Sequence, residues 1–322
     1  MTPAPFLSDI ASDAPKAQAY WLDTSDGVRV RTVLWGKGAE KGTVLLFPGR
    51  TEYAEKYVHT AAALQQGGYA TLAMDWRGQG LADRLLDNPL VGHVGKFADY
   101  QRDVAAMVEA ALDLDLPKPY FLIAHSMGGA IGLRALIEGL PVNASVFTGP
   151  MWGIIMNPAT RPAAWAITWA SKMLGTSDGL APGTRPAAYV LSEPFADNTL
   201  TTDPAMYDFM RDQLLAHPEL ALGGPSLNWL HEALKDTLEI SRRPAPGVPC
   251  ITFLGTNERI VDPRRIHNRM AGWPGGELVM IPQGEHEILM EGPEKRGPVL
   301  ERILALFDSH RNGDSQNTSV AC

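Results

Sequence analysis

A stretch that looks like a buried strand runs directly into a serine and then into a helical pattern in PYFLIAHSMGGAIGLRAL, residues 119–136. A sharp turn from strand to helix holds its middle residue in a strained backbone conformation, and the residues two places away must be small to avoid a collision. Ala124 and Gly128 meet this requirement. We therefore expect the turn to expose the hydroxyl of Ser126. A serine that only capped the next helix would not need small residues on both sides.

Apolar runs alternate with helical patterns along most of the chain. Alternation on both sides of Asp26-Gly27 predicts a hairpin, because this dipeptide tolerates the positive φ angles of tight hairpin turns. Six short apolar runs follow: GTVLLFPG, YATLAMDW, KPYFLIAHS, NASVFTGP, VPCITFLG and ELVMIP. Helical patterns separate or follow them over 54–66, 97–114, 127–139, 263–271 and 293–309. Strands and helices in alternation predict an α/β fold with a mostly parallel central sheet flanked by helices.

The alternation stops between the fourth and fifth of these runs. Residues 151–235 form a segment of 85 residues that is rich in Trp, Met, Pro and helical pattern. A segment of this length is too long for a loop in a compact domain, so we predict a helical cap (lid) inserted into the core. The expected division is 1–150 for the first part of the core, 151–235 for the cap, and 236–310 for the second part of the core. The polar end, 311–322, lacks periodicity and is expected to be disordered.

The charge and composition exclude several classes of partner. The chain has 322 residues and a formal net charge of −8, with no block of five or six like charges, so we expect no nucleic-acid partner and no polybasic membrane anchor. No window reaches the roughly 18 apolar residues of a membrane span, and the N-terminus lacks the pattern of a secretion signal, so a cytoplasmic protein is expected. The two cysteines, Cys250 and Cys322, give no zinc or disulfide spacing. Nothing in the sequence predicts a metal, an organic cofactor or an oligomeric state.

The exposed serine raises the question of its partners. A serine hydroxyl is a weak nucleophile until a base takes its proton, and a third group must orient that base. Along a sheet of this kind the chain order is nucleophile, acid, base, with each partner on a loop after a later strand. Of the eight histidines, only His286, just after the strand that ends at Ile281, meets this order. His125 should point away from Ser126 on a sharp turn. We predict Ser126 as nucleophile and His286 as base.

Two carboxylates compete for the role of the acid in CITFLGTNERIVDP. Glu258 lies three residues past Gly255, the end of the strand, which favours it. Asp262 precedes Pro263 and is typical of a helix N-cap, but it is the alternative acid. The oxyanion formed by attack on a carbonyl needs two backbone N–H donors.

One oxyanion donor is expected from Met127, directly after the nucleophile at a helix N-terminus. The other is expected from Arg50, in the loop LLFPGRTEY after the first parallel strand, where Gly49 permits a close approach.

Four longer motifs carry a resemblance: FPGRTEYAEKY, DWRGQGLADRLLDNPLVGHVGKFADY, AHSMGGAI and GPMWGI. From about Tyr20 to about Leu306 the chain resembles the α/β-hydrolase superfamily, and more closely its bacterial lysophospholipases and related monoacylglycerol lipases. The resemblance implies Ser126 as nucleophile, His286 as base, an acid within 257–262, and an ester of a single long acyl chain as substrate. Related lipases often have His-Gly where this chain has Pro48-Gly49, and Asp where it has Glu258.

The predicted function is therefore cofactor-independent hydrolysis of a small-molecule acyl ester or lysolipid, with transient contact with a lipid surface. Met151, Trp152 and Ile154, at the start of the cap, are expected to contact the substrate, because apolar side chains line pockets for apolar ligands. An acyltransferase, or a hydrolase of small peptides or amides that uses the same three residues, is an alternative. A further alternative is a non-catalytic binding protein with the same fold.

Overall fold

The computed structural model describes residues 1–11, 15–157 and 159–311. Within these residues nine strands form one sheet in the order β1-β2-β3-β5-β4-β6-β7-β8-β9. The strands are β1 (Thr2–Pro3), β2 (Ala17–Asp23), β3 (Arg29–Trp35), β4 (Thr43–Phe47), β5 (Ala70–Asp75), β6 (Tyr120–His125), β7 (Ala144–Thr148), β8 (Cys250–Gly255) and β9 (Gly276–Ile281). The expected tail, 311–322, lies outside the described residues except for its first residue.

The sheet changes from antiparallel to parallel along its width. β2 and β3 form the predicted hairpin, and β3 also pairs antiparallel with β5. From β5 to β9 every neighbouring pair is parallel. The strands β4 to β8 are buried along their whole length, as expected for parallel strands covered on both faces. The prediction of a mostly parallel central sheet is confirmed.

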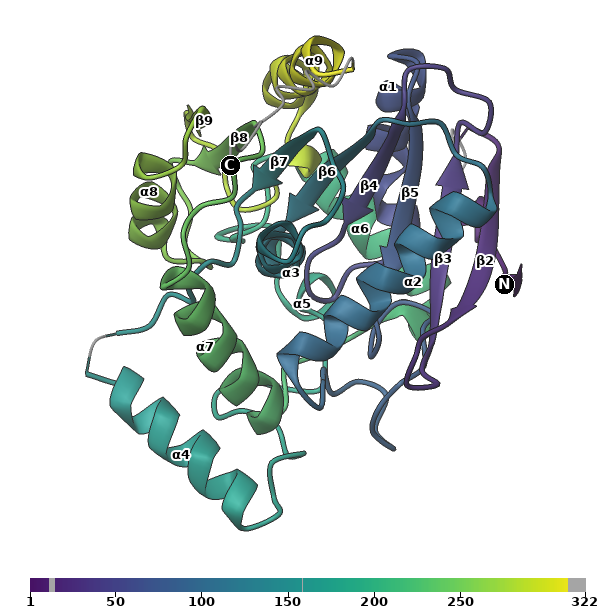
Figure 1. Cartoon of the computed structure of the whole chain (residues 1–322). Coiled ribbons are helices and arrows are strands. Elements are labelled where there is room, and N and C mark those ends of the chain that lie inside the picture. Colours follow the sequence, from purple (N-terminus) through teal and green to yellow (C-terminus); the bar gives the residue numbers. More distant parts are fainter. Residues whose placement is uncertain (12–14, 158, 312–322) are drawn as a thin grey trace, which may run out of the picture.

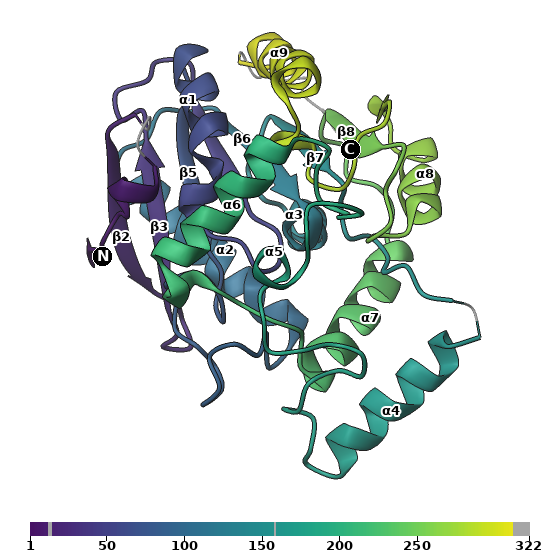
Figure 2. The same ribbon diagram turned by 180° about the vertical axis from the view of Figure 1, so that it is seen from behind.

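Helices cover both faces of the sheet (Figures 1 and 2). The described helices are α1 (Val58–Gln66), α2 (Tyr100–Asp113), α3 (Ser126–Ile137), α4 (Arg161–Met173), α5 (Tyr189–Ser192), α6 (Pro204–Ala216), α7 (Leu227–Ser241), α8 (Pro263–Ala271) and α9 (Pro293–Ser309), with short 3-10 turns η2 (Ala54–Tyr57) and η3 (Phe97–Asp99) before α1 and α2. Apolar side chains of α2, α3 and α8 pack in one core cluster. Those of α1, α6 and α9 pack in a second. No helix in the described part of the chain is both long and apolar enough to cross a membrane.

The chain between β7 and β8, which contains the predicted cap, forms a set of helices at one end of the sheet. α4 and α7 pack against each other, and α4 lies at the outer edge of the molecule (Figures 1 and 2). α6 and α5 lie over the other side of the core. The predicted cap, 151–235, contains α4, α5, α6 and the first part of α7. The predicted border at 235 falls inside α7, because this helix continues without interruption to Ser241.

Candidate active site

The turn from β6 into α3 has the geometry expected of a strained strand-to-helix junction. Ser126 has a φ of +49°, a left-handed conformation that residues with a side chain rarely adopt. Gly128 faces the end of β4 so closely that a Cβ atom there would lie 2.2 Å from the Phe47 carbonyl oxygen. The helix can therefore pack against β4 only with glycine at this position. The strain is held in place by packing on both sides, which presents the Ser126 side chain at the carboxyl edge of the sheet.

The structure brings three predicted residues into one hydrogen-bonded chain. The Ser126 Oγ atom lies 2.9 Å from His286 Nε2, and His286 Nδ1 lies 2.7 Å from Glu258 Oε2. The three side chains come from the start of α3, the loop after β9 and the loop after β8, which meet at the same edge because these strands are parallel. With the proton of the imidazole on Nδ1, His286 donates to the carboxylate and its Nε2 accepts the serine hydroxyl.

The two candidate acids have different partners. Glu258 Oε1 accepts hydrogen bonds from the backbone N–H groups of Ile260 (2.6 Å) and Val261 (3.0 Å), which leaves Oε2 for His286. Burial alone would raise the pKa of Glu258, but the charge of His286 and these hydrogen bonds hold it below its ordinary value. Asp262 accepts from the N–H of Arg264 at 3.1 Å and caps α8. The structure thus places Glu258, and not Asp262, against His286.

The loop after β4 is fixed by several side chains. The Trp76 indole donates to the Pro48 carbonyl at 2.9 Å, and Gln79 Nε2 donates to the Gly49 carbonyl at 2.7 Å. The Gly49 N–H donates to the Glu52 carboxylate. Within the described residues the N–H of Arg50 has no acceptor. This loop, called the oxyanion loop below, spans 48–52.

Met127, the second predicted oxyanion donor, stands in the first turn of α3. Backbone N–H groups in the first turn of a helix have no partner within the helix. Both predicted donors therefore keep a backbone N–H group that can donate a hydrogen bond to a ligand. One lies in the oxyanion loop and the other at the start of α3.

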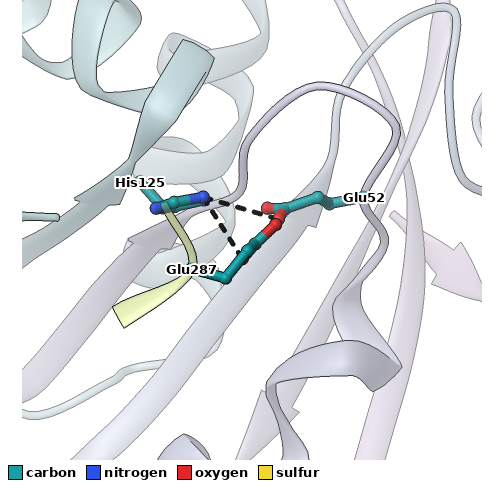
Figure 3. A group of neighbouring side chains, drawn as sticks. All are labelled: Glu52, His125 and Glu287. Atoms are coloured by element: carbon teal, nitrogen blue, oxygen red, sulfur yellow. Dashed lines mark ion pairs between the residues drawn. The ribbon is translucent and has the colours of Figure 1, made fainter. Parts of the chain in front are cut away.

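A buried charge cluster, which sequence reasoning missed, lies behind this site: Glu52, Lys56, His125 and Glu287. Lys56 Nζ donates to Glu52 and, at 2.7 Å, to Glu287. His125 Nε2 lies 3.3 Å from Glu287 Oε2 and 3.7 Å from Glu52 Oε1 (Figure 3). The His125 ring also lies 4.8 Å, centroid to centroid, from that of His286. The cluster thus joins the oxyanion loop to the residues beside the nucleophile and the base.

Three members of this cluster, Glu52, His125 and Glu287, lie close enough together to be considered as metal ligands. The Lys56 ammonium already contacts both carboxylates, so the cluster has its own cation. We therefore describe it as an internal ion-pair network. The sequence signal was the placement of charged residues in FPGRTEYAEKY and GEHEILME around two predicted site segments, but burial of these charges cannot be seen in the sequence.

A cavity of about 410 Å³ opens at Ser126 and His286 between the core and the cap. Its lining is mostly apolar on the cap side and on the loop after β8, where it includes Met151, Ile154, Val190, Leu200, Met210, Leu214, Leu230, Ile260 and Val261. Met151 and Ile154, two of the three residues that we expect to contact the substrate, line this cavity. Trp152 does not line the cavity: it packs against Phe147 and Trp273, and its indole donates to the Gly129 carbonyl at 3.1 Å. The expectation for Trp152 is corrected, because its neighbours bury it in the core.

Comparisons with known proteins agree with this geometry. A family model described as serine aminopeptidase, S33, matches residues 38–293. Lysophospholipase L2 of Escherichia coli (strain K12) is 33% identical over 305 residues, which cover 92% of this chain and 88% of that protein. Monoacylglycerol lipase of Mycolicibacterium smegmatis is 25% identical, covering 88% of this chain and 94% of that protein.

Among solved structures, a soluble variant of monoglyceride lipase from Saccharomyces cerevisiae in complex with a substrate analogue is similar, with a TM-score of 0.71 and 20% identity. The match covers 95% of this chain and 99% of that chain. At this level of identity the likeness is one of fold.

Proposed function

Because this chain belongs to the serine aminopeptidase S33 family of α/β hydrolases, and within it to the branch of lysophospholipases and monoacylglycerol lipases, we propose that it hydrolyses carboxylic esters of a single acyl chain through an acyl-enzyme on Ser126. The observation that carries the proposal is the hydrogen-bonded chain from Ser126 through His286 to Glu258. It lies at the mouth of an apolar cavity. The family membership supplies the reaction class, and the cavity supplies room for an acyl chain.

In the first half of the reaction, His286 Nε2 takes the hydroxyl proton as Ser126 Oγ attacks the ester carbonyl carbon. The Glu258 carboxylate holds the imidazole in the required tautomer and stabilises the positive charge that forms on it. His286 then gives the proton to the leaving alcohol. In the second half, a water molecule attacks the acyl-enzyme with His286 again as base, which releases the fatty acid and regenerates Ser126.

The oxyanion of both tetrahedral intermediates is stabilised by the N–H groups of Arg50 and Met127 in this proposal. The side chains that hold the oxyanion loop, Trp76, Gln79 and Glu52, fix the Arg50 peptide before substrate arrives. A donor that is already oriented costs no reorganisation during the reaction. The cavity between Met151, Ile154 and the helices of the cap receives the acyl chain.

The substrate is an acyl ester or lysolipid that is met at a lipid surface, so transient contact of the cap with such a surface belongs to the proposal. The cap, 151–235 in the division of the chain that we propose, presents exposed apolar side chains on α4. Location in the cytoplasm is also proposed, and fractionation of cells that express the tagged protein tests it.

The proposal is tested with a fluorophosphonate probe on the wild type, Ser126→Ala and, as a control, Ser241→Ala at the end of α7. We expect labelling of the wild type and of Ser241→Ala, no labelling of Ser126→Ala, and a loss of turnover on p-nitrophenyl esters by about a millionfold in Ser126→Ala. Labelling that persists in Ser126→Ala would contradict the assignment. Products formed with and without an added alcohol or amine separate hydrolysis from acyl transfer.

A further inference from the structure

The wall of the cavity contains one arginine and one lysine, Arg50 and Lys56. Lys56 is neutralised by Glu52 and Glu287. Arg50 is different, because no carboxylate among the described residues lies within 4.0 Å of its guanidinium. A partly enclosed cation without a counter-ion is unfavourable, since removal from water weakens its solvation and nothing replaces it.

The surroundings of Arg50 leave most of its hydrogen-bonding capacity unused. Its Nη1 donates to the Gly223 carbonyl of the cap at 2.8 Å, and the guanidinium lies 5.5 Å from the centre of the Trp229 ring. This is the one hydrogen bond of the Arg50 side chain within the described residues, although a guanidinium has five N–H donors. Burial lowers the pKa of Arg50 to about 10, so the group stays charged at neutral pH.

The fold makes room for this guanidinium. A Cβ atom on Gly92 would lie 2.9 Å from Arg50 Nη1, so a residue with a side chain there would displace it. The side chain leaves the oxyanion loop, whose N–H we assign to the scissile carbonyl, and extends toward the cap. A ligand group bound by the guanidinium would therefore belong to a part of the same ligand that is only a few covalent bonds from its scissile ester.

We propose that the Arg50 side chain binds the phosphodiester anion of a lysophospholipid and so favours this substrate over an uncharged monoacylglycerol. This inference rests on the proposed ester hydrolysis and adds the choice of head group. In a lysophospholipid the glycerol unit separates the scissile ester from the phosphodiester, a spacing comparable to the length of an arginine side chain. A guanidinium presents paired N–H donors that match two oxygens of a phosphate, and the phosphate supplies the missing negative charge.

The test compares kcat/KM for a lysophosphatidylcholine and a monoacylglycerol with the same acyl chain, in the wild type, Arg50→Met, Arg50→Lys and Arg84→Met. Arg84 is a matched control: its Nη2 also donates to a cap carbonyl, that of Glu219, at 2.8 Å, it has no ion pair within the described residues, and it does not line the cavity. We expect the ratio of lysophosphatidylcholine to monoacylglycerol activity to fall by about tenfold to a hundredfold in Arg50→Met, to fall less in Arg50→Lys, and to stay unchanged in Arg84→Met.

An unchanged ratio in Arg50→Met would overturn the inference, whatever loss the two substrates share. Absence of activity on both substrates in the wild type would instead contradict the proposed function, so the two failures are distinguishable. A second arm measures inhibition of monoacylglycerol hydrolysis by glycerophosphocholine and by inorganic phosphate. Inhibition by glycerophosphocholine that is stronger than by phosphate, and is lost in Arg50→Met, supports the head-group site. Equal inhibition by inorganic phosphate would assign Arg50 to a free anion and overturn it.

Discussion

Glu258 and Asp262 are separated by three residues, and their hydrogen bonds give them different tasks. Glu258 contacts His286, while Asp262 caps α8. In Glu258→Gln the amide cannot stabilise the imidazolium by charge, so we expect kcat to fall by about a thousandfold to ten-thousandfold. In Asp262→Asn we expect a change within about twofold, because asparagine is an equally good N-cap. Steady-state kinetics on a p-nitrophenyl ester measure both, and an equal loss in the two variants would show that Glu258 does not act alone.

The buried charge cluster gives His125 a pH-dependent contribution to stability. Burial alone would lower the pKa of His125, and Lys56 opposes its charge, but the carboxylates of Glu287 and Glu52 raise it above the ordinary value. A raised pKa in the folded state means that the protonated form stabilises the fold. This contribution is complete below about pH 6.5, the pKa in the unfolded chain, and is lost as the pH rises through the higher pKa of the folded state.

We expect the Tm of the wild type to decrease more between about pH 6 and about pH 9 than that of His125→Gln, which lacks the titrating group. Thermal unfolding of both proteins at several pH values measures the difference. A difference in Tm that stays constant over this range would contradict the role of His125⁺ in the cluster.

The residues of the proposed triad could be named from the sequence because each follows a recognisable strand, and chain order leaves few choices. The partners of Lys56 could not be named in this way. Lys56 and Glu287 are 231 positions apart, and both look like ordinary surface charges until the sheet brings their loops together. Trp152 was expected to contact the substrate because its apolar character is visible in the sequence. The direction of its side chain, into the core and away from the cavity, is not visible there, because it depends on packing against Phe147 and Trp273.

At the level of elements, the sequence predicted the strands β2 to β9 and the helices of the core, because each has one period and clear turn signals, but not the two-residue strand β1. Helices α8 and α9 have the predicted bounds. The border of the cap was less predictable, since the amphipathic pattern of α7 continues past residue 235 without a glycine or proline to end it. The order of strands in space, with β5 outside β4, is a property of the crossover connections and has no signal in any single strand.

Helix α6 offers a test of the acyl-chain slot. Leu214 lines the cavity, whereas the adjacent Leu215 points to solvent with 61% of its surface exposed. In Leu214→Trp the larger side chain fills part of the cavity, so we expect the preferred acyl length to become shorter, with at least a tenfold loss on the longest chain that the wild type accepts. Leu215→Trp is the matched control and should keep the wild-type preference. A series of p-nitrophenyl esters measures this, and an identical profile in all three proteins would place the acyl chain elsewhere.

At the scale of the whole molecule, the parallel sheet brings four segments together at one edge: the oxyanion loop, the start of α3, the loop after β8 and the loop after β9. The predicted cap lies over them. The Glu287 N–H donates to the Leu200 carbonyl of the cap at 2.8 Å, and Arg50 donates to Gly223. The base and the oxyanion loop are thus both tied to the cap. A change in the position of the segment between β7 and β8 would therefore alter hydrogen bonds of both the loop that carries the proposed base and the oxyanion loop.

The outer helix of the cap carries apolar side chains that no part of the described chain covers. On α4, Trp169 is 59% exposed and Met173 is 70% exposed. Isolated apolar side chains are common on surfaces, but a tryptophan and a methionine one turn apart on a helix at the edge of a lipid hydrolase are suited to contact acyl chains.

In the double variant Trp169→Glu/Met173→Glu we expect hydrolysis of a monoacylglycerol carried in phosphatidylcholine vesicles to fall by about tenfold or more, because the apolar contact with the lipid is lost and two negative charges are added. Hydrolysis of a water-soluble short-chain p-nitrophenyl ester should be unchanged, since the site itself is intact. Leu112→Glu, on α2 of the core and 52% exposed in the wild type, is the control for the loss of an exposed apolar side chain away from the cap. Equal losses on the vesicle and on the soluble ester would mean that the variant disturbs the cap and not its contact with lipid. Unchanged activity on both substrates would mean that α4 is not the surface that meets the lipid.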